Sequence, residues 1–119
     1  YSKMLIDDGY HLGTRYFTKN IIKKFTKRQN ITEGSDRTLG WDTPSQNGNS
    51  SAGDYFSESS FGHLGFTGTS MWIDPENEII VILLTNRVYP TRNKENIKDK
   101  MYRFRRDFHN HVMKEILEL

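Results

Sequence analysis

The chain of 119 residues contains no cysteine and no long apolar segment. The absence of cysteine excludes disulfide bonds, thiolate chemistry and cysteine-ligated zinc. The longest apolar run, Ile79 to Leu84, is far shorter than the roughly 18 residues that a membrane-spanning helix needs. The net charge is only +2, so the overall charge gives no reason to expect a nucleic-acid or membrane partner. Aromatic residues make up 13% of the chain, which argues against disorder and favours one folded domain.

A strong strand pattern occupies the stretch from Ser60 to Asn86. It predicts three successive antiparallel strands, at 61–66, 69–74 and 78–86. The last two are joined by Asp74-Pro75-Glu76-Asn77, in which Pro75 presets φ and Asn77 tolerates left-handed geometry. The last strand is apolar on both faces, whereas an antiparallel strand with one solvated face would alternate. We therefore expect an α/β (α+β) fold, with an antiparallel sheet and helices on both faces.

Two helices are predicted before these strands. Apolar residues spaced three and four apart predict a helix over 1–9, with Gly9 as its C-terminal cap. Thr18 is placed to cap a second helix over 18–28, whose buried face would consist of Ile21, Ile22 and Phe25. Because the chain starts within a helical pattern and without methionine, we expect a further segment upstream of Tyr1.

The remaining segments are a short strand, a loop and a long helix. Leu39 to Asp42 predicts a strand that ends before Pro44. The segment 45–60 is rich in Ser, Gly and Asn, and loops of this length tend to be functional or mobile. Its expected anchors are Tyr55 and Phe56. A C-terminal helix is predicted over 94–118, with a buried face that steps through Ile97, Met101, Phe104, Phe108, Val112 and Ile116.

The most distinctive motif is the glycine-rich segment Gly62-His63-Leu64-Gly65-Phe66-Thr67-Gly68. A strand edge rich in glycine lets a substrate approach closely, and a substrate amide can pair with such an edge as an added strand. A backbone N–H at this edge can act as one donor of an oxyanion hole, and His63 places an imidazole beside it. Taken alone, a histidine in a glycine-rich turn is more typical of a structural role.

The motif stands in a specific order with others. Trp72-Ile73-Asp74-Pro75 and Leu84-Thr85-Asn86-Arg87 follow it, and Gly40-Trp41-Asp42, Ser50-Ser51-Ala52-Gly53 and Tyr55-Phe56-Ser57 precede it. In this order the stretches resemble the C-terminal part of the serine beta-lactamase-related family. That family includes class C beta-lactamases, penicillin-binding DD-peptidases and related esterases. The resemblance implies that 1–119 is the C-terminal portion of a single domain with a beta-lactamase/transpeptidase-like fold.

The resemblance also implies a role for each residue of the motif. Family members use Ser-x-x-Lys, then Tyr-x-Asn or Ser-x-Asn, then a strand triad such as Lys-Thr-Gly or His-x-Gly. By this resemblance His63-Leu64-Gly65 is the third motif. Phe66 would donate its backbone N–H to the oxyanion hole, and His63 would help to organise the proton network around the nucleophile and its lysine. The substrate-binding site would be lined by Leu64, Thr67 and Gly68. No metal or organic cofactor is implied.

The first two family motifs are not found. No serine has lysine three positions on, and no tyrosine has asparagine two positions on. Ser45-Gln46-Asn47 matches Ser-x-Asn, but it lies in the loop just before the strands, whereas the family's second motif lies far upstream. We interpret this match as chance. The chain is thus expected to be one part of a serine hydrolase, inactive alone, whose nucleophile lies in a missing N-terminal portion. Its substrate would be a beta-lactam, a D-Ala-D-Ala peptide or an ester.

Other interpretations stay open beside this one. A non-catalytic binding or interaction module of the same fold would equally lack Ser-x-x-Lys, and the sequence encoded before Tyr1 would decide between the two. The basic residues of 18–28 and of Arg103, Arg105 and Arg106 could bind phosphate groups. Acidic residues are interspersed among them, which favours a solvated face and no nucleic-acid partner.

Three further expectations follow from the pattern and the resemblance. His109 and His111 are two positions apart and lie on different sides of a helix, which argues against a metal site. The strand 78–86 would present an unpaired apolar edge without the N-terminal strands of the family fold, so we expect self-association. Family members are usually exported, which implies the periplasm or the cell envelope.

Overall fold

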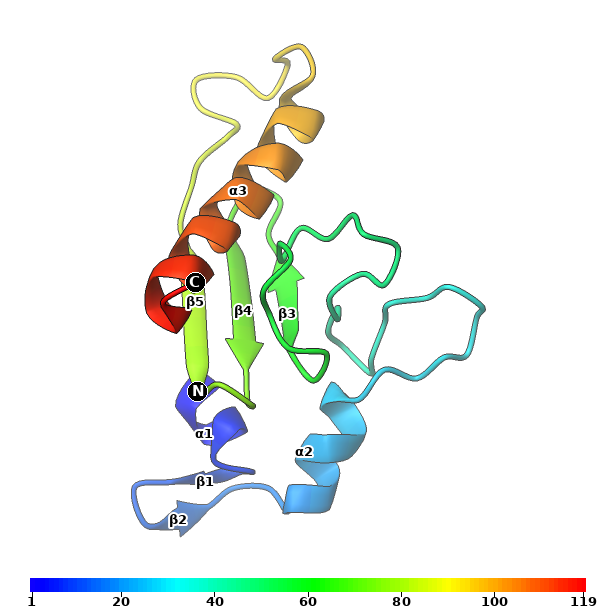
Figure 1. The fold of residues 1–119 in the computed structure, drawn as a ribbon, viewed down its shortest axis with the longest axis vertical. Coiled ribbons are helices and arrows are strands. Elements are labelled where there is room, and N and C mark those ends of the chain that lie inside the picture. Colours follow the sequence, from blue (N-terminus) through cyan, green and yellow to red (C-terminus); the bar gives the residue numbers. More distant parts are fainter.

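The computed structural model describes residues 1–119 and combines helices with antiparallel sheets, which confirms the expected mixed α/β class. The main sheet has the strand order β3–β4–β5, formed by Phe61–Leu64, Ser70–Asp74 and Ile79–Leu83. Helix α3, Ile97–Leu117, runs along this sheet. Helix α1, Ser2–Ile6, lies beside the end of the sheet where β4 turns into β5 (Figure 1). The hairpin of β1, Tyr10–His11, and β2, Thr14–Arg15, leads from α1 to α2, Lys19–Thr26.

The central strand β4 divides the core into two halves. Trp72 pairs with Val81, whereas its neighbour Ile73 pairs with Phe61 and Ile80. Successive side chains of a strand point to opposite faces, so Trp72 and Ile73 lie on opposite sides of the sheet. The Trp72 side packs against the loop and α3 through Ala52, Phe56, Ile79, Val81 and Met113. The Ile73 side packs against α1 and α2 through Met4, Leu5, Ile22 and Phe61.

The β4–β5 turn is organised by the buried carboxylate of Asp74. Its Oδ1 accepts hydrogen bonds from the backbone N–H groups of Glu76 and Asn77 at 3.0 and 3.1 Å and from the Ser57 hydroxyl at 2.7 Å. Its Oδ2 accepts from the Ser57 backbone N–H at 3.0 Å and from the Asn77 side-chain amide at 2.9 Å. Burial alone would raise the pKa of Asp74, but the donors from Ser57 and Asn77 outweigh burial and hold its pKa below the usual range. The left-handed residue here is Glu78, with φ of 56°, whereas Asn77, which would tolerate that geometry, does not adopt it.

Helix α3 buries a different face from the predicted one. Its buried residues recur every four positions at Met101, Arg105, His109 and Met113. Phe104 and Ile116, which were predicted to be buried, are 49% and 53% exposed. The prediction followed the apolar residues. The helix instead turns Arg105 and His109 toward the sheet, because hydrogen-bond partners for both side chains lie there. None of the helices is both long enough and apolar enough to cross a membrane.

Two N-terminal predictions also need correction. Thr18 caps α2 as expected, since its hydroxyl oxygen accepts a hydrogen bond from the Ile21 N–H at 3.3 Å. Of the predicted buried face only Ile22 is buried, whereas Ile21 and Phe25 are 44% and 47% exposed. The expected strand 39–42 is reduced to isolated bridges, in which Asp42 pairs with Arg37 and with Gly62. The strand does not extend through Gly40, because its φ of 133° departs from the negative φ of a strand residue.

The loop 45–60 is fixed to the body of the protein. Phe56 is buried and Tyr55 is partly buried against the same core cluster, which confirms both anchors. Helix α3 adds polar contacts, because the Asn110 side-chain oxygen accepts from the Asp54 N–H at 2.7 Å and Arg106 forms an ion pair with the Asp54 carboxylate at 3.0 Å. Its buried residues include Ser50, Ala52 and Ser60.

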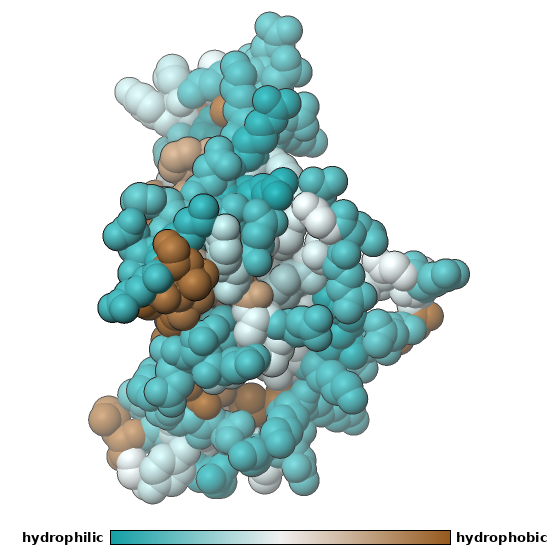
Figure 2. Space-filling view, in the orientation of Figure 1, coloured by the Kyte–Doolittle hydropathy of each residue, from teal (hydrophilic) through white to brown (hydrophobic).

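The outer edge of β5 generates the first prediction. No strand pairs with this edge, and its neighbouring side chains Ile82 and Leu84 are 55% and 79% exposed. Figure 2 shows that hydrophobic residues gather in patches on an otherwise hydrophilic face, one of them where α3 ends beside β5. Because an unpaired apolar edge favours strand addition, we expect the chain to self-associate.

An Ile82→Lys substitution should weaken this association by about tenfold, or ~1.4 kcal/mol, because charge on an edge strand opposes pairing. Sedimentation velocity over a concentration series measures the effect. Ile31→Lys is the matched control, since Ile31 is 83% exposed and lies far from β5 in the chain. A monodisperse wild-type monomer at every concentration would contradict the prediction.

Candidate active-site turn

The predicted site residues form one continuous segment that ends β3 and turns into β4. The turn is closed by a hydrogen bond of 3.1 Å from the Gly68 N–H to the Gly65 oxygen, and below it the Gly65 N–H donates to Thr69 at 2.8 Å. Gly68 has a φ of 98°, and a Cβ atom there would collide with Thr85 and Met101. Only glycine fits this position, so the turn is specified by the sequence itself.

The segment lies on an edge strand that is only partly covered. Asp42 pairs with Gly62 through two backbone hydrogen bonds of 2.8 and 2.9 Å, and this pairing closes the lower part of the β3 edge. Leu64 is two residues further on, so its backbone polar groups point to the same edge beyond Asp42. The upper edge is therefore open beside the turn.

His63 lies on the face opposite to α3, in the row that it forms with Met71 and Ile82 across the sheet. Its side chain is exposed, and its Nδ1 is 2.8 Å from the Leu64 carbonyl oxygen. A carbonyl oxygen only accepts, so Nδ1 carries the proton in this contact and Nε2 is free to contact another group. Phe66 projects outward at 66% exposure, while Leu64 and Thr67 are partly buried and Gly68 is buried.

Every carbonyl group of the turn accepts a hydrogen bond from another part of the protein. Arg105 of α3 donates to the carbonyl oxygens of Gly65, Gly68 and Thr69 at 3.0, 2.9 and 2.9 Å. The Arg87 side chain donates to the Phe66 oxygen at 2.6 Å, and its backbone N–H donates to Thr67 at 2.8 Å. The Arg87 guanidinium also stacks over the Phe66 ring, 4.7 Å from its centroid.

The backbone N–H groups of Phe66 and Thr67 have no hydrogen-bond partner within the chain. The turn thus has free N–H groups, whereas each of its carbonyl oxygens accepts a hydrogen bond from the protein. Two guanidinium groups lie behind it, so the local electrostatics favour a negative charge in front of it. Such an arrangement can bind an anion or stabilise an oxyanion that forms on a substrate carbonyl.

Beside Arg105, α3 places a second polar group under the sheet. His109 is fully buried, with Nδ1 2.8 Å from the Ser51 carbonyl oxygen and Nε2 3.2 Å from the Ser70 hydroxyl. The Ser51 carbonyl oxygen can only accept, so Nδ1 is the donor. In the neutral ring Nε2 then accepts a hydrogen bond from the Ser70 hydroxyl. Burial lowers the pKa of His109, and the charge of Arg105 lowers it further against the opposing effect of the Ser51 contact. His109 therefore joins the loop, α3 and β4 as a neutral connector.

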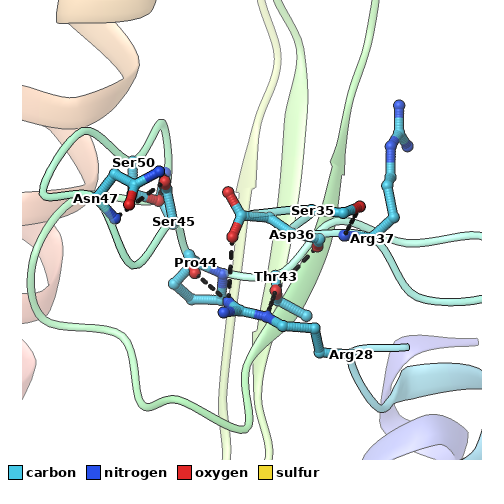
Figure 3. Close-up of polar contacts among 10 residues, drawn as sticks. Arg28, Ser35, Asp36, Arg37, Thr43, Pro44, Ser45, Asn47 and Ser50 are labelled. Atoms are coloured by element: carbon cyan, nitrogen blue, oxygen red, sulfur yellow. Dashed lines mark hydrogen bonds and ion pairs between the residues drawn. The ribbon is translucent and has the colours of Figure 1, made fainter. Parts of the chain in front are cut away.

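Ser45-Gln46-Asn47, the match that we interpreted as chance, forms a local turn in which the Asn47 N–H lies 3.5 Å from the Ser45 hydroxyl oxygen. Figure 3 shows this segment beside Arg28, which donates to the Thr43 hydroxyl at 2.9 Å and to the Pro44 carbonyl at 2.6 Å. Arg28 also forms an ion pair with Asp36 at 3.5 Å. These contacts hold the start of the loop to the end of α2. Nowhere in the chain do three or more His, Asp or Glu side chains gather in a way that could hold a metal ion.

Sequence reasoning missed the two arginines and the buried histidine. It assigned Arg105 to a solvated basic face together with Arg103 and Arg106, and this assignment is wrong because Arg105 is only 8% exposed. The available signal was spacing, since Arg105 lies four residues after Met101 and four before His109, on one stripe of the helix. Arg87 had no comparable signal, because its partner is a carbonyl group 21 residues away.

Comparison with known proteins agrees with the motif order. The family model described as Beta-lactamase matches residues 8–102. The chain therefore belongs to the serine beta-lactamase-related family. Proteins of Salmonella gallinarum (strain 287/91 / NCTC 13346) and Salmonella typhi, each named "Putative D-alanyl-D-alanine carboxypeptidase", are 33% and 32% identical to it over 89 residues. The matched region covers 71% of this chain and 19% of each relative, so the chain spans about a fifth of the length of the curated relatives that it matches.

The neutral state of His109 generates a prediction for the pH dependence of stability. Its pKa is lowered in the folded chain, whereas the unfolded chain takes up a proton near pH 6.5. The unfolded state thus binds more protons below that pH, and the free energy of unfolding should fall as the pH drops below about 6.5 toward the folded-state pKa. Above that range the contribution of His109 is fully present.

Chemical denaturation at about pH 7.5 and about pH 5.5 measures this effect. His109→Gln should reduce stability at the higher pH and flatten the difference between the two conditions. His111→Gln serves as the control because His111 is exposed on the same helix. An unchanged pH difference in His109→Gln would show that another group is responsible.

Proposed function

We propose that this chain supplies the oxyanion-binding wall of a serine hydrolase that transfers the acyl group of a peptide ending in D-Ala-D-Ala. The observation that carries the proposal is the β3–β4 turn, whose Phe66 N–H is free at an open strand edge while all its carbonyl groups accept hydrogen bonds from the protein. The names of the two relatives support the substrate class. A beta-lactam and a small ester are the alternative substrates of the same chemistry.

In the proposed reaction a serine from the rest of the protein attacks the carbonyl carbon between the two D-alanines. Negative charge then develops on the carbonyl oxygen, and the Phe66 N–H stabilises it there as one of the donors. The C–N bond breaks, D-alanine leaves with a proton, and the serine carries the acyl group as an ester. Water hydrolyses the ester and restores the serine.

His63 and the strand edge complete the proposed site. The protonated Nδ1 of His63 is held by the Leu64 oxygen, so Nε2 remains available to accept one hydrogen bond within the proton network of the nucleophile and its lysine. The open edge at Leu64 suits a substrate backbone that adds as a further strand, with Thr67 and Gly68 beside it. Under this proposal the nucleophile and the second motif lie outside 1–119, and the protein acts in the periplasm or the cell envelope.

A second candidate, a non-catalytic binding module of the same fold, agrees equally well with one observation. No serine in the chain is followed by lysine three positions on. If the full-length protein also lacks Ser-x-x-Lys, the free N–H groups of the turn would bind a carboxylate or a carbonyl group without any reaction. Covalent labelling of the full-length protein with a fluorescent penicillin separates the two, because only a serine enzyme forms the acyl product.

A pair of substitutions at one position tests the role of the Phe66 N–H. Phe66 is the second residue of the turn, where proline is favoured, so Phe66→Pro removes the N–H and keeps the backbone course. Phe66→Ala is the matched control, because it removes the ring and its contact with Arg87 but keeps the N–H.

In the full-length protein Phe66→Pro should lower kcat by about 10²–10³ relative to Phe66→Ala, as expected for the loss of one oxyanion donor. Release of D-alanine from a D-Ala-D-Ala peptide measures the rate. The chain 1–119 alone should neither release D-alanine nor take up the penicillin label. Equal rates for the two variants would contradict the proposed role of the Phe66 N–H in the oxyanion hole.

A further inference from the structure

Arg105 is a charged side chain in an unusual environment. It is 8% exposed, and no ion pair of the chain includes it. Burying an unpaired charge costs free energy, and burial, followed by the charge of Arg87, accordingly lowers the pKa of Arg105. Packing alone would be served as well by a methionine, which stands four residues before it on the same stripe. The retained charge calls for a role beyond packing.

The three carbonyl groups that Arg105 binds bracket the turn on both sides. Nε donates to Gly68, and one terminal nitrogen donates to both Gly65 and Thr69. The planar guanidinium offers these donors in a fixed fork, so the three acceptors are locked relative to one another. The Gly65 oxygen is decisive, because it also accepts the hydrogen bond from Gly68 that closes the turn.

The Gly65 oxygen and the Phe66 N–H belong to the same peptide unit. In a planar trans peptide the C=O and N–H bonds point in opposite directions. A donor that holds the Gly65 oxygen inside therefore aims the Phe66 N–H outside. If this peptide rotated, the carbonyl oxygen would replace the N–H at the open edge and would repel an oxyanion. Hydrogen bonding to the C=O also polarises the peptide and makes its N–H a better donor.

We propose that Arg105 is a positioning residue that sets the direction of the Phe66 N–H through the Gly65 carbonyl group. This role rests on the proposed function, in which that N–H meets the oxyanion. Arg87 has a different part, because the Phe66 oxygen that it binds belongs to the next peptide unit and so directs the Thr67 N–H. The two arginines thus orient two successive N–H groups of the turn.

The first experiment measures the conformation of the turn and does not depend on enzymatic activity. Backbone amide exchange by NMR in Arg105→Met should show faster exchange of the Gly68 N–H, about tenfold or more, because the fork no longer supports the closed turn. The Phe66 amide resonance should shift as well. Met113→Ala is the control, because Met113 is fully buried on the same helix stripe and its loss costs stability without touching the turn.

The second experiment measures catalysis in the full-length protein. Arg105→Met should lower kcat per penicillin-labelled site by about 10²-fold, the cost of a misplaced group, with KM little changed. Arg105→Lys keeps the charge but lacks the planar fork of fixed donors, so it should recover only part of the rate. Free guanidinium should raise the rate of Arg105→Ala and leave Met113→Ala unaffected.

The outcomes separate this proposal from the proposed function. A full-length protein with no label and no hydrolysis would contradict the function, while the amide measurements would still decide whether Arg105 orders the turn. An unchanged Phe66 resonance and Gly68 exchange rate in a folded Arg105→Met or Arg105→Lys would overturn the positioning role. So would a wild-type kcat per labelled site in either variant.

Discussion

The contact between α3 and the end of the β3–β4 hairpin is the interaction on which the rest of the structure depends. It is polar at its centre, because Arg105 and His109 stand on the helix stripe between Met101 and Met113. The two apolar ends resemble ordinary helix-on-sheet packing, whereas the centre fixes one register of the helix. A one-residue rotation of α3 would break the hydrogen bonds from Arg105 to three carbonyl groups and the contact of His109 with the Ser70 hydroxyl. Apolar packing alone specifies a register less strictly.

The same polar contact joins segments that are distant in the sequence. Asp54 and Ser51 belong to the loop, and α3 holds both through Arg106, Asn110 and His109. Ser57 then connects the loop to Asp74 at the opposite end of β4. The middle and later parts of the long polar loop are thereby attached to α3 and β4, the elements that carry the turn. This explains how a chain with an apolar fraction of only 34% can hold an edge strand and its turn in one conformation.

The local elements could be predicted from the sequence because short-range physics decides them. The cap at Thr18, the strand pattern from Phe61 onward and the glycine-rich turn all depend on neighbours within a few residues. The buried face of α3 could not be predicted in this way. Its position depends on carbonyl acceptors some 40 residues earlier, and hydrophobicity ranks Phe104 above Arg105 for burial. The prediction that Ile21 and Phe25 are buried was wrong for a related reason. An amphipathic pattern shows which side of a helix is apolar, but not whether another element covers that side.

The motif itself was found from sequence, but its chemistry depends on parts that the motif does not contain. Gly62 to Gly68 gives the backbone its course, while Arg87 and Arg105 decide which way the peptide groups of that course point. A turn with the same glycines and no internal donors could present carbonyl oxygens at its open edge and would then repel an oxyanion. The capacity to bind negative charge therefore comes from the pairing of a permissive backbone with two fixed cations behind it. Since both cations bind backbone atoms, this arrangement depends on the two arginines and on the glycine at position 68, and less on the other side chains of the turn.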